Sequence, residues 1–157
     1  MKISVLCVGG VKTKFLKDGI EQYKRWLSRY AKLDLIYIKS GGDVNKLPKE
    51  RILYNEAVKL IKYIRKNSFN ILLDKSAKQL SSEAFSKFLN DIFMHSNKAE
   101  ILFTIGGVHG VDNSLESKFD MKLSLSRMTF THEFTVLILL EQLYRAFKII
   151  NNEKYHY

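Results

Sequence analysis

The sequence predicts an α/β fold in which a mainly parallel sheet is flanked by helices. Two observations predict it. Short apolar runs, typical of buried strands, alternate with longer segments whose apolar residues recur at helical spacing. In addition, no repeat, low-complexity tract or linker-like stretch divides the 157 residues. We therefore expect one domain spanning residues 1–157, large enough to bury a core of its own.

The first half of the chain supplies two strands and two helices. Residues 3–8 form the first expected strand, which ends at a pair of glycines, and residues 33–38 form the second. Between them, residues 14–30 carry apolar side chains at helical spacing among Lys, Glu and Arg. Pro48, the only proline, suits the first turn of a helix that we expect to run to about residue 66. Its inward-facing residues should be Ile52, Leu53, Val58, Leu60, Ile61 and Ile64.

The second half continues the alternation. Strands are expected over residues 70–74, 100–105 and 122–126, a helix capped by Ser81 and Ser82 up to about residue 94, and a short helix or turn over 112–119. A long helix over residues 132–150 is apolar on more than one face. Because one sheet face in so small a domain cannot cover all of that surface, the excess is either core or a subunit interface, and we favour a homodimer.

The charge of the chain points to an anionic partner. Lys and Arg outnumber Asp and Glu by 26 to 16, a formal net charge of +10. RNA or DNA is the first candidate and an anionic membrane surface the second, while a merely basic small protein is the plainer interpretation. The first helical segment concentrates cations and is a candidate phosphate-contacting face or an ordinary solvated one: Lys12, Lys14, Lys17, Lys24, Arg25, Arg29 and Lys32.

The single cysteine and the N-terminus indicate a cytoplasmic protein. Cys7 cannot form an internal disulfide, and its place in an apolar strand predicts a buried structural thiol, as suits a reducing compartment. The N-terminal apolar run is too short for a signal peptide, and no apolar run approaches the roughly 20 residues that span a bilayer. We therefore expect a soluble protein without a membrane segment.

Glycines at the end of the fourth strand form the first candidate site. Gly106, Gly107 and Gly110 leave backbone groups bare, so a ligand can lie against them, although a tight turn alone would also explain them. The spacing and position do not match a Rossmann dinucleotide site or a P-loop. No Gly-x-Ser-x-Gly elbow occurs. No metal site is predicted, because none of the four histidines pairs with a cysteine or acid at ligand spacing: His95, His109, His132 and His156.

The C-terminus is basic and aromatic. Arginine can clamp phosphate and aromatic rings can stack on bases, although a solvated helix end with a mobile tail is the plainer interpretation. The residues concerned are Tyr144, Arg145, Lys148, Lys154, Tyr155, His156 and Tyr157. His132, which starts the last helix after a polar segment, is by itself equally explained as a capping or surface histidine.

Taken together, these segments resemble one family. They are Ile105-Gly106-Gly107 with Gly110, Leu125-Ser126-x-Met128-Thr129-Phe130-x-His132, Glu141-Gln142-x-Tyr144-Arg145-Ala146 and Tyr155-His156, with Leu73, the run Leu80-Ser81-Ser82-Glu83 and the N-terminal strand in support. The chain is similar to the SPOUT-class ribosomal RNA large-subunit methyltransferase H family, which methylates N3 of a pseudouridine in 23S rRNA. Each piece is a weak signal, and the combination is specific.

The resemblance implies a C-terminal trefoil knot, S-adenosylmethionine as methyl donor, and a homodimer whose sites lie at the interface. It also implies that 23S rRNA is met within the assembled ribosome. The family's donor-binding positions correspond to Leu73, Gly106 and the segment Leu125, Ser126, Arg127, Met128, Thr129 and Phe130, with Gly107 and Gly110 shaping the loop. Knots are otherwise rare in proteins, and this family is among the exceptions.

For the chemistry, the resemblance makes His132 and His156 candidate proton acceptors, Tyr155 an orienting group and Arg145 a phosphate or imide clamp. Three positions depart from the usual family pattern: Thr131 stands where Pro is common, Glu133 where Gln or Pro is common, and Val136 where Arg is frequent. Two rival functions remain open at this stage. One is a non-catalytic basic RNA-binding module, and the other is a SPOUT enzyme that acts on transfer RNA.

Overall fold

Five parallel strands form the centre of the molecule. A computed structural model describes residues 2–155. The strands are β1 (Lys2–Val8), β2 (Lys32–Ile38), β3 (Ser68–Leu73), β4 (Glu100–Ile105) and β5 (Met121–Leu123), in the spatial order β2-β1-β4-β3-β5. Every pairing is parallel. The predicted α/β class with a parallel sheet is therefore confirmed.

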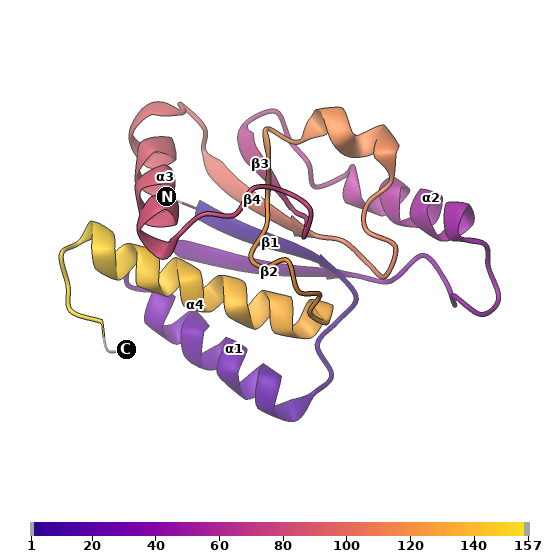
Figure 1. Cartoon of the computed structure of the whole chain (residues 1–157), viewed down its shortest axis with the longest axis horizontal. Coiled ribbons are helices and arrows are strands. Elements are labelled where there is room, and N and C mark those ends of the chain that lie inside the picture. Colours follow the sequence, from indigo (N-terminus) through magenta and orange to yellow (C-terminus); the bar gives the residue numbers. More distant parts are fainter. Residues whose placement is uncertain (1, 156–157) are drawn as a thin grey trace.

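Helices cover both faces of the sheet because strand residues alternate between the faces. One core joins Val5, Cys7 and Phe103 to α1 (Lys14–Leu27), α3 (Ser82–His95) and α4 (His132–Ile150). The other joins Leu6, Val8 and Leu102 to α2 (Lys49–Leu60) and the 3₁₀ helix η1 (Asn113–Lys118). Figure 1 shows α4 lying beside α1, with α2 apart from both.

Several predicted boundaries were wrong. The first helix ends at Leu27 and not at residue 30, because residues 28–30 form a turn closed by Tyr30 N–H on the Leu27 carbonyl. Helix α2 ends at Leu60 and not near residue 66, because β3 already begins at Ser68, in register with Glu100 of β4. Strand β5 is Met121–Leu123 and not 122–126, because Ser124 leaves β3 and bonds to the carbonyl of Lys78.

The predicted inward face of α2 was partly wrong as well. Ile52, Ala57 and Leu60 are buried, whereas Val58 and Ile61 are exposed. Six apolar positions are too many for one buried stripe, since a helix presents only a limited arc to a sheet. A carboxylate, Glu56, occupies one of the inward positions instead.

The two predicted helix starts, at Ser81 and Ser82 and at His132, are present. The hydroxyl of Ser81 accepts a hydrogen bond from Ala84 N–H at 3.1 Å, which satisfies a free donor in the first turn of α3. At α4, the hydroxyl of Thr131 accepts from Phe134 N–H at 3.3 Å. Thr131, which departs from the family's usual proline, thus caps the helix. Val136 is fully buried, so this second departure belongs to the core.

After β5 the chain passes along the loop that follows β3. Asp74 N–H donates to the Leu123 carbonyl, Ser124 N–H to the Lys78 carbonyl, each at 3.0 Å, and Gln79 pairs with Ser124 as an isolated bridge. The chain then returns as α4 across the sheet, against α1 and α3 (Figure 1). This path is consistent with the C-terminal knot that the family resemblance implies.

Cys7 is fully buried, and burial raises the pKa of its thiol to about 12. Such a thiol stays protonated at neutral pH, so it packs as a small apolar group and is no nucleophile. Within residues 2–155, no helix is both long and apolar enough to cross a bilayer. The same residues contain no group of three or more His, Cys, Asp or Glu side chains placed to hold a metal ion.

Candidate functional site

The predicted donor-binding segments meet at the carboxyl edge of the sheet. Leu73 is in register with Ile105 on one side and with Leu123 on the other, so β3, β4 and β5 end together. The glycine turn continues β4 and the 125–130 segment follows β5 closely. In open parallel sheets, ligands bind at this edge because the loops there are free to vary. The structure therefore brings together the three segments that are predicted to bind the methyl donor.

The glycine turn is compact and tolerates no side chain at its start. Gly110 N–H donates to the Gly107 carbonyl at 3.0 Å, and Gly110 has φ +80°, a conformation that favours glycine. A Cβ atom on Gly106 would lie 2.7 Å from the Gly110 carbonyl oxygen. The turn thus closes on itself, and its backbone can be approached by a ligand without obstruction from side chains at these positions.

Beneath this turn lies Glu56, a residue that sequence reasoning missed. It is 2% exposed, and one of its oxygens accepts from Gly41 N–H at 2.9 Å. A Cβ on Gly107 would stand 3.0 Å from both of its oxygens, so the carboxyl group packs directly against the turn. Burial raises the pKa of Glu56, opposed by the Gly41 bond and by His109 and Lys59. The available signal was a charged residue in register with Ile52 and Leu60 on the buried side of α2.

The 125–130 segment is held by hydroxyl groups and presents an exposed tip. Ser124 Oγ donates to the Lys75 carbonyl at 3.1 Å, and Ser126 Oγ accepts from Met128 N–H at 3.0 Å. Lys75 Nζ in turn donates to Thr129 Oγ1 at 3.2 Å. Met128 is 76% exposed and Phe130 38%. Both apolar side chains are thus available at the surface for contact with a ligand or a partner.

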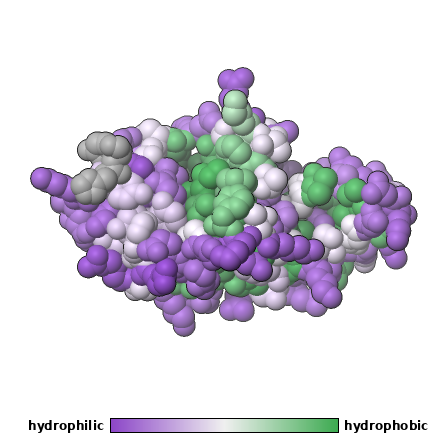
Figure 2. All heavy atoms as spheres, turned by 90° about the horizontal axis from the view of Figure 1, so that it is seen from below, coloured by the Kyte–Doolittle hydropathy of each residue, from purple (hydrophilic) through white to green (hydrophobic). Residues whose placement is uncertain are grey.

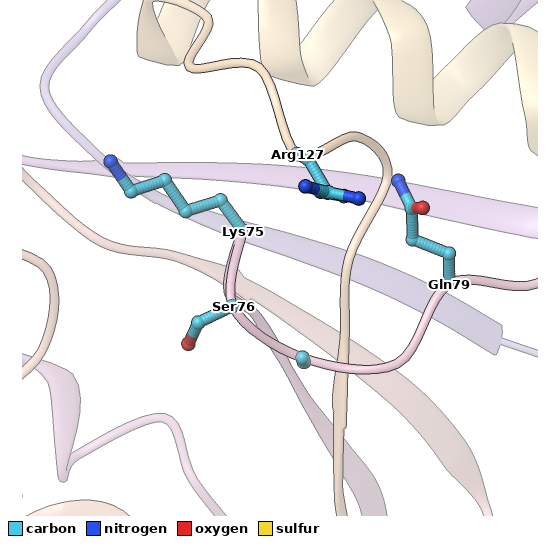
Figure 3. Close-up of a pocket in the computed structure, with 5 residues that line it drawn as sticks. Lys75, Ser76, Gln79 and Arg127 are labelled. Atoms are coloured by element: carbon cyan, nitrogen blue, oxygen red, sulfur yellow. The ribbon is translucent and has the colours of Figure 1, made fainter.

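A hollow of about 380 Å³ lies between this segment and the loop after β3. Its lining residues are Lys75, Ser76, Ala77, Gln79 and Arg127. Figure 3 shows Arg127 on a different loop from Lys75, Ser76 and Gln79. Of the predicted donor-binding residues, only Arg127 belongs to this set. The two cations that line this hollow, Lys75 and Arg127, suit an anionic group, either the carboxylate of an amino acid or a phosphate.

His132 begins α4 at the same edge of the sheet. Its Nε2 lies 2.8 Å from the carbonyl oxygen of Gly10, in the loop after β1. A carbonyl oxygen only accepts, so Nε2 carries the hydrogen in this bond and the neutral ring keeps its free lone pair on Nδ1. Next to it, Glu133 accepts from Lys12 N–H at 2.5 Å and from Thr13 Oγ1 at 2.6 Å. The loop after β1 is thus fastened to the start of α4.

Arg145 and Tyr155 form a second cluster near the other end of α4. Arg145 donates to Glu141 Oε1 through Nε and Nη2, at 3.2 and 2.8 Å, and Tyr155 donates its hydroxyl to the same oxygen at 3.0 Å. The Arg145 guanidinium lies 4.3 Å from the Tyr155 ring centre. Burial, followed by hydrogen bonding to Tyr23 and Glu141, raises the pKa of Tyr155, so the phenol stays neutral. Glu141 and Arg145 stand four residues apart on α4, the spacing at which opposite charges pair along a helix.

The structure does not bring all predicted catalytic residues together within one chain. His132 and Arg145 are 13 positions apart on one helix, a rise of about 20 Å. His132 lies with the donor-binding segments, whereas Arg145 and Tyr155 lie together elsewhere. The fourth candidate, His156, falls outside the described residues. One nucleobase could therefore not contact both His132 and the Arg145–Tyr155 cluster of the same chain.

Comparison with known proteins agrees with this architecture. A family model described as "Predicted SPOUT methyltransferase" matches residues 1–156. The ribosomal RNA large subunit methyltransferase H of Acetivibrio thermocellus is 41% identical over 159 residues, covering 99% of both chains. The enzymes of the same name from Thermosipho melanesiensis and Dictyoglomus thermophilum are 41% and 39% identical over 157 residues, covering 100% of both chains. The chain belongs to the SPOUT methyltransferase family, and it is a methyltransferase.

Proposed function

We propose that the protein, acting as one domain over residues 1–157, transfers a methyl group from S-adenosylmethionine to N3 of a pseudouridine in 23S rRNA. The observation that carries the proposal is the meeting of Leu73, the glycine turn and the 125–130 segment at one sheet edge, in a chain similar along its whole length to the relatives above. Those relatives are named as methyltransferases of large-subunit ribosomal RNA.

The residues present fit the donor. The glycine turn offers backbone without side-chain obstruction, Met128 and Phe130 supply exposed apolar surface, and Arg127 with Lys75 can hold a carboxylate. Leu73, Leu125 and Ser126 would line the inner wall, with Thr129 fixed by Lys75. When bound, S-adenosylmethionine supplies a methyl group activated by the sulfonium, so the protein has mainly to position the acceptor.

The acceptor nitrogen must lose its proton before or during attack. A base within hydrogen-bond reach would accept that proton and leave the nitrogen lone pair free to take the methyl group that the bound donor would supply. His132 is the candidate base in the described chain, because its Nε2 is committed to Gly10 and its Nδ1 lone pair is left for a proton. Arg145, oriented by Tyr155 and Glu141, would hold the imide or a neighbouring phosphate. His156 remains a further candidate.

The proposed active form is a homodimer. Because His132 and the Arg145–Tyr155 cluster lie about 20 Å apart on one helix, a complete site calls for the cluster of a second copy. An apolar patch near the starts of α1 and α4 supports this arrangement, and Figure 2 shows it ringed by hydrophilic side chains. Phe15 and Phe134 are 62% and 42% exposed there, and their ring centres are 6.0 Å apart. A patch of this kind is typical of a subunit contact.

We further propose that the substrate is the assembled large ribosomal subunit in the cytoplasm. The chain is small for reading an RNA sequence by itself, so a large scaffold would have to present the target. Isolated RNA fragments should then be poor substrates. Efficient methylation of a short hairpin would contradict this part of the proposal.

Two measurements test the function. Calorimetry with S-adenosylhomocysteine should show micromolar-range binding, an order of magnitude common for metabolite ligands. Mass mapping of RNA from cells with and without the protein should then place the lost methyl group on a 23S rRNA pseudouridine. Absence of cofactor binding would favour a non-catalytic RNA-binding module, and a lost methyl group in transfer RNA would reassign the substrate.

A further inference from the structure

Half of the net charge of the chain resides in residues 39–66. This stretch, which includes α2, holds eight Lys and Arg residues against three acidic ones. One of the three acids, Glu56, is buried beneath the glycine turn and contributes nothing to the surface. The remaining surface of α2 and its flanking loops is therefore strongly positive.

These cations are not neutralised by neighbouring carboxylates. No ion pair among the described residues involves a cation of this stretch, whereas α1 pairs Lys14 with Asp18 and Lys24 with Glu21. Lys59 donates to the backbone carbonyls of Lys39 and Ser40, at 3.0 and 3.2 Å. A second hollow, of about 280 Å³, is lined by Ile38, Lys39, Lys59, Lys62 and Tyr63.

Apolar side chains stand exposed among these charges. On α2, Tyr54 is 59% exposed and Val58 44%, although the fold buries the opposite side of the helix, and Ile61, just past the end of the helix, is 39% exposed. Together with two cations these residues form a set that we call the α2 face: Arg51, Tyr54 and Val58 on the helix, and Ile61 and Lys62 in the turn that follows it. Cations interleaved with an exposed aromatic ring are the pattern of surfaces that track a phosphate backbone and stack on bases.

The α2 face belongs to an element that touches the donor site. Glu56 joins α2 to the loop at the end of β2 through Gly41, and packs against Gly107 of the glycine turn. Strand β2 ends beside β1 at the same edge of the sheet as the donor-binding loops. Because Glu56 lies on the opposite side of α2, an RNA strand on the α2 face would be about one helix diameter, about 10 Å, from the glycine turn.

We propose that the α2 face binds the phosphodiester backbone of the ribosomal RNA that flanks the target nucleotide. Arg51 and Lys62 contact phosphates, with Lys39 and Lys59 supplying the field around the second hollow, and Tyr54 stacks on an unpaired base. The charge complementarity favours RNA over an acidic protein or an anionic membrane, because a stacking ring accompanies the cations. The proposal rests on the function proposed above.

The test compares Arg51→Ala/Lys62→Ala with Lys17→Ala/Lys87→Ala, which removes two exposed cations from α1 and α3. Binding of each full-length protein to large ribosomal subunits lacking the modification is measured across a salt series. Arg51→Ala/Lys62→Ala should bind roughly tenfold more weakly and lower the slope of log Kd against log salt by about 1.5 to 2, as expected for two lost phosphate contacts. Tyr54→Ala should weaken binding about tenfold with little change in that slope.

Calorimetry with S-adenosylhomocysteine and thermal melts on the same proteins separate the possible results. Wild-type protein without cofactor binding or methyl transfer would overturn the proposed function itself. Active wild-type protein with unchanged ribosome binding in Arg51→Ala/Lys62→Ala, or an equal loss in Lys17→Ala/Lys87→Ala, would overturn the α2 face alone. Binding of the α2 face to anionic vesicles, with unchanged ribosome binding on its mutation, would do the same.

Discussion

The guanidinium of Arg145 lies 4.3 Å from the centre of the Tyr155 ring, and both side chains donate to the same oxygen of Glu141. One carboxylate thus holds a residue of α4 and a residue of the C-terminal tail in fixed relation. The ring centre of Tyr144 lies a further 5.3 Å from that of Tyr155. The tail is therefore attached to the helix, and the position of Arg145 is determined before any RNA arrives.

Replacing Arg145 by lysine should lower kcat roughly tenfold while leaving S-adenosylhomocysteine affinity within about twofold. Lysine keeps the charge but loses the two-pronged contact to Glu141 and the flat stacking surface over Tyr155. Single-turnover methylation of large ribosomal subunits and calorimetry give the two values. Tyr155→Phe, which keeps the ring and loses only the hydroxyl bond, should show a smaller loss. Equal loss in both variants would mean that the ion pair does not position the arginine.

His132→Gln should lower methyl transfer by about 10²-fold, the usual size of a lost general base, with cofactor affinity nearly unchanged. Glutamine can still donate to the Gly10 carbonyl, so the loop after β1 stays attached while the basic Nδ1 is removed. His132→Ala removes both functions and should also lower the melting temperature. A glutamine variant with wild-type kcat would assign His132 a purely structural role.

Much of the fold could be predicted from periodicity. The strand ending at Val8 and the helix starting at His132 follow from runs of apolar residues and from the polar segment before the helix. The extent of α2 could not, because its end depends on the register of Ser68 against Glu100, which only the folded sheet defines. Apolar content in residues 61–64 imitates a longer helix, whereas those residues form a turn and a connection.

The candidate site was predictable in its parts and not in its arrangement. The family resemblance supplied Leu73 and Gly106, and the structure brings their segments together at one edge. The predicted helix over residues 132–150 already separated His132 from Arg145 by about 20 Å, but spacing along the chain does not show which residues a second subunit would bring to either end. Glu56 escaped because a charged residue in an apolar stripe is normally assigned to the solvent side.

Substitutions in the glycine turn can test two requirements separately: the lack of room for a side chain and a backbone conformation that favours glycine. Gly106→Ala places a Cβ 2.7 Å from the Gly110 carbonyl oxygen, so it should weaken S-adenosylhomocysteine binding by tenfold or more, on the order of 1.4 kcal/mol. Gly110→Ala meets no atom within 4 Å but has φ +80°, and should cost about 1 kcal/mol of stability with a smaller effect on binding. Gly10→Ala meets neither constraint and serves as the control. Equal affinity in all three would contradict a donor site at this turn.

The contribution of Glu56 to the stability of the protein should fall with rising pH, and the substitution Glu56→Gln should abolish this pH dependence. Burial raises the pKa of this carboxyl group above its ordinary value of about 4.3, so the folded state binds the proton more tightly than the unfolded state. The stabilisation is complete below the unfolded pKa and is lost as pH rises through the raised, folded one. Urea unfolding of wild type and Glu56→Gln at pH 4, 5.5 and 7 should therefore show the variant gaining relative stability with pH.

Two further variants make that result specific. Glu56→Ala leaves the Gly41 N–H without its acceptor and should cost about 1 to 3 kcal/mol at every pH, unlike glutamine. The charges that oppose the rise in the Glu56 pKa belong to His109 and Lys59, so the comparison is repeated in a His109→Gln background, which removes one of them. If the wild-type and Glu56→Gln curves run parallel in both backgrounds, Glu56 does not carry the buried proton, and its contact with the glycine turn is one of packing alone.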